Sequence, residues 1–308
     1  MTIPDTIETI GQSAFVGCAF KSFTLPKNVK TINLYAFQNC TNLEEIIFNE
    51  KLEIIGNYAW KGCSNLKCID FSNTKSLTSF PAFDGCTALE YVHLPLPSVY
   101  EKTKGIFDDC ENLKTVVFCE GTETIITNIL YGNHSVENVI IPASVKTIEQ
   151  NAFSGCSKIK HIELPDGLEV IKSGAFSGCS SLEEIIIPAS VKEIGSNAFS
   201  GNNQVCNKIQ VLSSNIKWEG TAGTFPTSVN TLEVIDIHCP FPQGMFSGPY
   251  NALKELVFPE GPSDLASFIS IQALSLETIK FSSTIENISS SSFNNCPKLK
   301  YLEVPSTI

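Results

Sequence analysis

Hydrophobic residues recur along the chain with a long and regular period. An aromatic residue, often preceded by alanine, returns every 21 to 26 residues. Its positions are Phe15, Phe37, Trp60, Phe83, Phe107, Tyr131, Phe153, Phe176, Phe199, Phe225, Phe246, Phe268 and Phe293. This return predicts about thirteen copies of one structural unit, each of which buries its apolar side only by stacking on its neighbours.

A six-place phrase follows each aromatic residue by about six positions, and its first, fourth and sixth places are apolar. Residues 182–187 show it clearly, with Pro188 directly after them. The fourth and sixth side chains lie two residues apart, so they share one face of an extended strand. Proline has no N–H to donate to a ladder and ends the strand. Each repeat therefore predicts one short parallel strand.

The segment that returns to the next aromatic residue has apolar residues spaced by three and four, as in residues 191–199. This spacing predicts a short helical or irregular turn, with the small alanine placed where neighbouring copies approach closely. Parallel strands need a crossover connection, and such connections are right-handed in nearly all proteins. The return segments are expected to supply these crossovers.

The repeated pattern L-x-x-I-x-L-P-x-x-V-x-x-I-x-x-x-A-F-x-x-C closely resembles the BspA-like leucine-rich repeats, over nearly the whole chain. The resemblance implies an α/β repeat solenoid: a right-handed leucine-rich repeat superhelix with a parallel concave β-sheet and short helical or irregular convex segments. Residues 202–250 depart from the pattern, and Tyr131 lacks the following cysteine, with His134 in its place. Members of this family are typically surface or secreted proteins of bacteria and some parasitic protists, associated with adhesion.

We expect residues 1–308 to form a single leucine-rich repeat domain of about 13 repeats. Ile3–Ile7 and Val304–Ile308 carry the same phrase at the same phase, without polar caps. This predicts a fragment of a longer array, or ends that associate end to end with another chain. A structural or self-assembling protein is therefore the alternative to a binding scaffold.

In leucine-rich repeats the second, third and fifth places of the strand phrase face solvent on the inner curve. The second places alternate in charge, except at Asn207. They are Lys21, Glu44, Lys67, Glu90, Lys114, Glu137, Lys160, Glu183, Asn207, Glu233, Lys254, Glu277 and Lys300. This ladder either holds the strands in register or orients a ligand by electrostatic complementarity.

The third and fifth places vary, and several of them are aromatic or apolar. Outward apolar residues include Ile47 and Val257. Interfaces favour such anchors within a polar rim, whereas the alternative is a set of tolerated sheet-surface residues. The predicted ligand-binding residues lie between Leu89 and Ile186. They are Tyr91, His93, Val117, Ile140, His161, Glu163, Glu184 and Ile186.

Charge and motifs narrow the class of function. A net charge of −11 disfavours a nucleic-acid partner, which requires clustered Lys and Arg. No apolar run could insert into a membrane, and Met1–Asp5 contains neither export signal nor anchor, so a cytoplasmic location stays open beside the cell-surface or secreted location that the family implies. No phosphate loop, nucleophile elbow or zinc motif occurs. We therefore predict no enzyme, no cofactor, and a protein ligand, such as a host, matrix or neighbouring-cell protein, bound on the concave sheet.

Eight of the twelve cysteines occupy one repeat position: Cys18, Cys40, Cys63, Cys86, Cys110, Cys156, Cys179 and Cys296. Free cysteine behaves as a small hydrophobic residue, so we expect a buried ladder of thiols. Disulfides between adjacent repeats are the alternative and need suitable side-chain directions. His93 and His161 could share a metal only if strands three repeats apart converged, so we predict no metal site.

Overall fold

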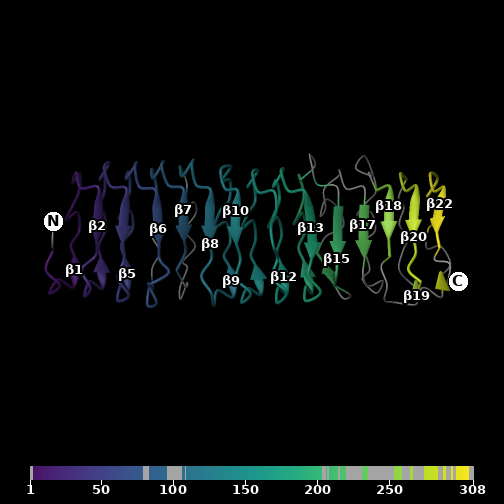
Figure 1. Cartoon of the computed structure of the whole chain (residues 1–308), viewed down its shortest axis with the longest axis horizontal. Coiled ribbons are helices and arrows are strands. Elements are labelled where there is room, and N and C mark those ends of the chain that lie inside the picture. Colours follow the sequence, from purple (N-terminus) through teal and green to yellow (C-terminus); the bar gives the residue numbers. More distant parts are fainter. Residues whose placement is uncertain are drawn as a thin grey trace. The chain divides into compact units, whose positions relative to one another are not determined.

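A computed structural model describes residues 3–78, 83–95, 106–107, 109–202, 206, 208–213, 216–219, 231–234, 253–258, 264–265, 274–283, 287–288, 293 and 296–304. The described backbone contains 22 strands (Figure 1). It forms two compact units, Met1–Ser144 and Val145–Ile308, and each is considered by itself. The repeat aromatics Phe225, Phe246 and Phe268 lie outside the described residues.

In the first unit, the described repeats contribute six long strands, and four return segments form a two-residue strand. The long strands form one six-stranded parallel sheet in sequence order: β2 (Ser22–Thr24), β4 (Glu45–Ile47), β6 (Cys68–Asp70), β7 (Tyr91–His93), β8 (Thr115–Val117) and β10 (Asn138–Ile140). Two-residue strands follow in the return segments: β1 (Thr9–Ile10), β3 (Thr31–Ile32), β5 (Ile54–Ile55) and β9 (Thr124–Ile125). β1, β3 and β5 pair in parallel as a second sheet. The predicted stack of parallel strands is confirmed.

The second unit repeats this plan. Its long strands are β13 (Glu184–Ile187), β15 (Lys208–Val211), β17 (Thr231–Val234), β18 (Glu255–Val257), β20 (Thr278–Lys280) and β22 (Tyr301–Glu303). They form one six-stranded sheet in sequence order. Its short strands are β11 (Thr147–Ile148), β12 (Val170–Ile171), β14 (Glu193–Ile194), β16 (Lys217–Trp218), β19 (Asp264–Leu265) and β21 (Asn287–Ile288).

The return segments are predicted to be helical or irregular, and no helix occurs among the described residues. Their backbone N–H groups bond to the next coil instead: the N–H of Phe153 donates to the carbonyl of Ala175 at 2.8 Å. Two left-handed residues in the same turn, Asn151 (φ 54°) and Gly155 (φ 82°), also interrupt any helical path. Hydrogen bonds between coils thus replace the bonds that a helix would form within itself.

Stacked aromatic side chains form the core of the coils. In the first unit the rings of Phe37 and Trp60 lie 6.2 Å apart at 8°, and those of Trp60 and Phe83 lie 5.8 Å apart at 13°. In the second unit Phe176 stacks on Phe153 and on Phe199, in both cases at 5.2 Å. The aromatic repeat position therefore marks a column of stacked rings in described coils of each unit, as the periodicity predicts.

Tyr131 is the exception, and its assignment to that column is wrong. Leu130 is 1% exposed, whereas Tyr131 is 59% exposed. The left-handed residues Asn128 (φ 59°) and Gly132 (φ 74°) flank Leu130 as Asn151 and Gly155 flank Phe153. Leu130 thus occupies the aromatic place. The cysteine place of this coil then falls on the residue before His134.

That residue is Asn133, and its side chain organises the turn in place of a thiol. Its Oδ1 accepts hydrogen bonds from the N–H of Ser135 at 3.0 Å and from the N–H of Val136 at 3.1 Å. The hydroxyl of Ser135 in turn donates to the carbonyl of Cys110, one coil earlier, at 3.2 Å. A polar pair therefore links the two coils at the point where cysteine links others.

Thiols of the repeat position donate hydrogen bonds to the preceding coil, at Cys40, Cys63, Cys86, Cys110 and Cys179. Cys63 Sγ donates to the carbonyl of Phe37 at 3.1 Å, and Cys86 Sγ donates to that of Trp60 at 3.3 Å. Burial raises the pKa of Cys86 to about 12. The cysteines that the structure describes form no disulfide, and six of the eight repeat cysteines are buried. Cys18 and Cys296 are only half-buried. The thiol ladder is confirmed for the described coils.

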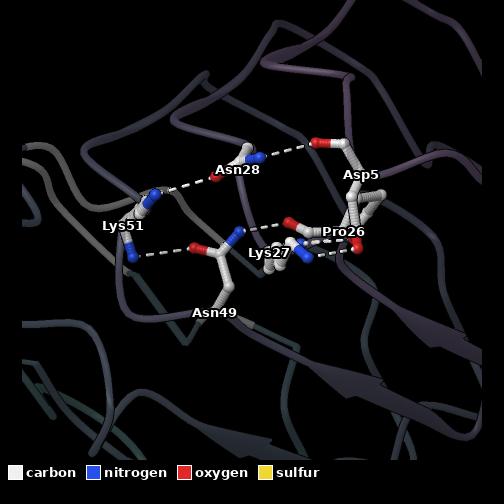
Figure 2. Close-up of polar contacts among 6 residues, drawn as sticks. All are labelled: Asp5, Pro26, Lys27, Asn28, Asn49 and Lys51. Carbon is white, nitrogen blue, oxygen red and sulfur yellow. Dashed lines mark hydrogen bonds and ion pairs between the residues drawn. The ribbon is translucent and has the colours of Figure 1, made fainter.

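Polar side chains bridge successive coils in the turns that follow the long strands (Figure 2). Lys51 Nζ donates to Asn28 Oδ1 at 2.8 Å, and Asn28 Nδ2 donates to the carbonyl of Asp5 at 2.8 Å. Lys27 pairs with Asp5 at 2.9 Å and holds the pKa of that carboxyl below its usual value. These contacts join three coils one after another and satisfy backbone groups that strand pairing does not reach.

Strand register corrects one step of the second-place charge ladder. Glu233 lies opposite Gln210 of β15 and opposite Val257 of β18, which are fifth-place residues. Glu233 is therefore a fifth-place residue too, and the regular alternation does not extend to it. Asn207, the other irregular position of the ladder, lies outside the described residues.

Candidate protein-binding surface

The outward side of the six-stranded sheet in the first unit is the candidate surface, called here the first-unit face. Strand alternation divides the side chains: the central residues Ile46, Ile69 and Val92 are buried, while their neighbours point outward. The third places form one outward row: Ser22, Glu45, Cys68, Tyr91, Thr115 and Asn138. The fifth places form the other: Thr24, Ile47, Asp70, His93, Val117 and Ile140.

Four of the predicted site residues come together on this face. Tyr91 and His93 lie on β7, and His93 is in register with Val117 of β8. Val117 is in turn in register with Ile140 of β10. Ile140 is 54% exposed, while the other three are half-buried. Neighbouring strands are about 4.8 Å apart, so the four side chains form one contiguous surface.

The other four predicted residues belong to the second unit. His161 and Glu163 are exposed and lie in a segment, residues 159–165, where no strand forms. His161 Nε2 lies 3.7 Å from Glu183 Oε2. Glu184 and Ile186 lie on β13, two residues apart on the same exposed side, and Ile186 is 42% exposed. The structure thus places them in two pairs within the second unit.

The same rows contain residues that the predicted site omits. Ile47 on β4 is 48% exposed, and Asp70 on β6 lies in register with His93. Asp70 Oδ1 is 3.5 Å from His93 Nδ1 and also accepts the N–H of Ser72 at 2.8 Å. Glu45 is exposed at the third place of β4. Extending the third and fifth places to earlier repeats is the sequence signal that identifies them.

Local electrostatics make the centre of this face acidic. Burial raises the pKa of Tyr91, and the nearby Asp70 and Cys68 raise it further. Burial also raises the pKa of Cys68, with added effects from Asp70 and Glu45. The carboxylates therefore act electrostatically on Tyr91 and Cys68 of the third row.

The charged residues of the second-place ladder lie beside these rows and form ion pairs with one another. Lys67 lies 3.1 Å from Glu44, and Lys114 lies 3.3 Å from Glu90. Lys67, by hydrogen bonding and charge, lowers the pKa of Glu44. Side chains at these positions are largely exposed, so each pair contributes little to stability. Register is the property that they influence most directly.

A second alternating ladder, absent from the sequence prediction, flanks the short strands. Glu8 pairs with Lys30 at 3.7 Å in the first unit, and Glu169 pairs with Lys192 at 2.8 Å in the second. Each of these residues directly precedes a two-residue strand. The same repeat period shows these alternating charges in the sequence, but the return segments are interpreted from their apolar spacing alone.

The described residues hold no cluster of three or more His, Cys, Asp or Glu side chains arranged to bind a metal ion. They also include no helix that is long and apolar enough to cross a membrane. The candidate site is therefore a sheet surface, defined by its exposed apolar, aromatic and acidic side chains.

Comparison with known proteins identifies the repeat. A family model described as BspA type leucine rich repeat region matches residues 1–103, 76–206 and 240–308. A search of curated proteins found no match. Three solved structures illustrate the structural likeness.

A leucine rich cell surface protein from Faecalibacterium prausnitzii A2-165 is 21% identical over 93% of this chain and 88% of its own, with a TM-score of 0.44. A leucine-rich repeat protein from Bacteroides ovatus ATCC 8483 is 22% identical over 98% and 83%, also with a TM-score of 0.44. Another from Eubacterium ventriosum ATCC 27560 is 20% identical over 97% and 77%, with a TM-score of 0.37. The family model spans most of the sequence, and the chain belongs to the BspA-type leucine-rich repeat family.

Proposed function

We propose that the chain is a non-enzymatic scaffold that binds a protein ligand on the first-unit face. The observation that carries the proposal is the exposure of large apolar side chains, Ile47 at 48% and Ile140 at 54%, on one sheet around Tyr91. Exposed apolar residues that gather on one surface mark interaction sites more often than isolated ones do. Aromatic and apolar anchors are also the residues that dominate binding energy at protein interfaces.

The scaffold beneath this face favours binding without rearrangement. The central residue of each strand from β4 to β8 is buried, and the stacked rings of Phe37, Trp60 and Phe83 lie in the core of the same unit. A surface held in this way loses little conformational freedom when a ligand binds. The proposal includes adhesion as the biological role and a cell-surface or secreted location, both supported by the family.

An experiment on exposed isoleucines tests the proposal with a matched control. Ile47→Ser together with Ile140→Ser removes the anchors of the first-unit face. Ile54→Ser removes an isoleucine that is 44% exposed on the short strand β5. Each variant, biotinylated beside the wild type, is used to capture proteins from a surface extract of host or neighbouring cells, and the captured proteins are quantified by mass spectrometry.

We expect at least one captured protein to fall about tenfold with the double variant and to stay unchanged with Ile54→Ser. Circular dichroism confirms that each variant is folded. If every captured protein binds the double variant as well as it binds the wild type, the first-unit face is not the binding site. Ile186→Ser, measured in the same capture experiment, would then test whether the second unit binds the ligand.

A further inference from the structure

We infer that the first-unit face takes a cationic polypeptide segment that also carries apolar side chains. This inference rests on the proposed function and adds the chemistry of the partner. It depends on how charges are distributed among the twelve side chains of the third and fifth rows. Histidine aside, only two of these side chains carry a charge at neutral pH, and both are acidic: Glu45 and Asp70. Neither row contains Lys or Arg.

Neither carboxylate has a lysine or arginine partner on the face. Glu45 is exposed and makes no ion pair within the part of the chain that the structure describes. Asp70 has half of its side chain exposed, and its partner is His93 at 3.5 Å. The nearest lysine row does not neutralise them, because Lys67 bonds Glu44 and Lys114 bonds Glu90.

The corresponding rows of the second unit contain lysines among their carboxylates. There, Lys280 of β20 lies 2.6 Å from Glu255 and 3.9 Å from Glu303. One lysine of these rows is thus shared by two carboxylates of the same sheet. The first-unit face contains no lysine in either row, so its carboxylates have no lysine partner of this kind.

The carboxylates lie among apolar groups, and this arrangement indicates the chemistry of the partner. Glu45 is in register with Cys68, and Cys68 is in register with Tyr91, so the carboxylate and the aromatic ring lie two strands apart in the same row. Ile47 lies two residues from Glu45 on the same side of β4. A ligand that covers Ile47 and Tyr91 therefore also removes water from Glu45 and Asp70.

Removing water from a carboxylate is costly unless a cation or hydrogen-bond donor replaces it. A neutral apolar ligand would leave both carboxylates without a partner, and an acidic ligand would add repulsion. A segment with alternating basic and apolar side chains supplies ion pairs for Glu45 and Asp70 and apolar contacts for Ile47. Its basic groups can also lie over the ring of Tyr91.

Fluorescence anisotropy with four labelled twelve-residue peptides tests this inference. The peptides alternate Lys with Leu, Ser with Leu, Glu with Leu, and Lys with Ser, and binding is measured at 150 mM salt. We expect the Lys–Leu peptide to bind best. Glu45→Gln with Asp70→Asn should weaken its binding about tenfold, and Ile47→Ser should weaken it by a similar factor.

Glu53→Gln with Glu123→Gln is the matched control, because it removes the same charge from exposed residues that precede β5 and β9. Equal loss of Lys–Leu binding in this control would mean that net charge alone attracts the peptide, which overturns the inference. Failure of the Lys–Leu peptide to bind also overturns it, whereas the extract experiment judges the proposed function separately. If the Ser–Leu or Glu–Leu peptide binds as tightly and depends on Ile47, binding at this face stands and the cationic partner does not.

Discussion

The thiol of Cys179 donates a hydrogen bond to the carbonyl oxygen of Phe153, one coil earlier, at 3.3 Å. In the next coil a side-chain amide makes the equivalent hydrogen bond: Asn202 Nδ2 donates to the carbonyl of Phe176 at 3.1 Å. Both donors are buried. In these two coils the repeat position therefore supplies a small buried donor, whether the residue is cysteine or asparagine.

Cys179→Val keeps the volume of this position and removes the donor. We expect it to lower the free energy of unfolding by about 0.5–1.5 kcal/mol, because the carbonyl of Phe153 loses the thiol donor and keeps the N–H of Cys156 at 3.1 Å. Cys179→Asn retains a donor of the kind found at Asn202 and should cost less. Urea unfolding followed by circular dichroism measures both. Equal stability of the valine variant and the wild type would contradict the role of this bond.

Leu130 and Tyr131 provide a direct test of the corrected repeat alignment. Leu130→Ala should lower the free energy of unfolding by about 2–5 kcal/mol, because a fully buried leucine leaves a cavity. Tyr131→Ala changes an exposed side chain and should stay within about 0.5 kcal/mol. Denaturant unfolding of the two variants compares them. A larger loss for Tyr131→Ala would restore the tyrosine to the core column.

Gly195 is predicted to tolerate no side chain because its coil lies directly against the preceding one. A Cβ atom there would lie 2.2 Å from the backbone nitrogen of Ser173. Gly195→Ala should therefore destabilise the protein by about 1–3 kcal/mol.

Gly11 holds the same place after a short strand and provides the control. A Cβ atom at Gly11 has no neighbour within 4 Å. Gly11→Ala should be neutral or slightly stabilising, because alanine restricts the unfolded chain more than glycine does. Thermal unfolding of both variants shows the difference, and a stable Gly195→Ala protein would refute the close contact.

The ion pair of Lys67 with Glu44 gives a prediction for pH. Lys67 lowers the pKa of Glu44 below its usual value, so the pair stabilises the fold at pH values above the usual pKa of a glutamate side chain. This contribution is lost as the pH falls through the lowered pKa of Glu44. Lys67→Met should raise the pKa of Glu44 and remove this part of the acid sensitivity.

A carboxyl-carbon NMR titration measures the pKa of Glu44 directly. Lys61→Met is the control, since Lys61 Nζ lies 5.1 Å from the ring centroid of Tyr58 and is not among the causes of the Glu44 shift. If the pKa of Glu44 is the same in the wild type and in Lys67→Met, the ladder pair does not form in solution.

Much of the candidate site could be read from the repeat. Once the phrase was aligned, the outward positions of Tyr91, His93, Val117 and Ile140 followed from strand alternation alone. Asp70 and Glu45 occupy equivalent places in earlier repeats, but their importance depends on which charges remain unpaired. That depends on actual distances, such as the 3.1 Å between Lys67 and Glu44, which no sequence pattern supplies.

The sequence by itself determined the stacking period, the aromatic column through Phe153 and Phe176, and the buried thiols, because each is a burial pattern repeated along the chain. Only the tertiary structure decided that Leu130 replaces Tyr131 in the core and that Glu233 is a fifth-place residue. It also decided that the N–H of Phe153 bonds Ala175 of the next coil, so that turns and two-residue strands form in place of a helix. The reason is physical: burial periodicity is local, whereas the partner of each backbone group and each charge lies one coil away.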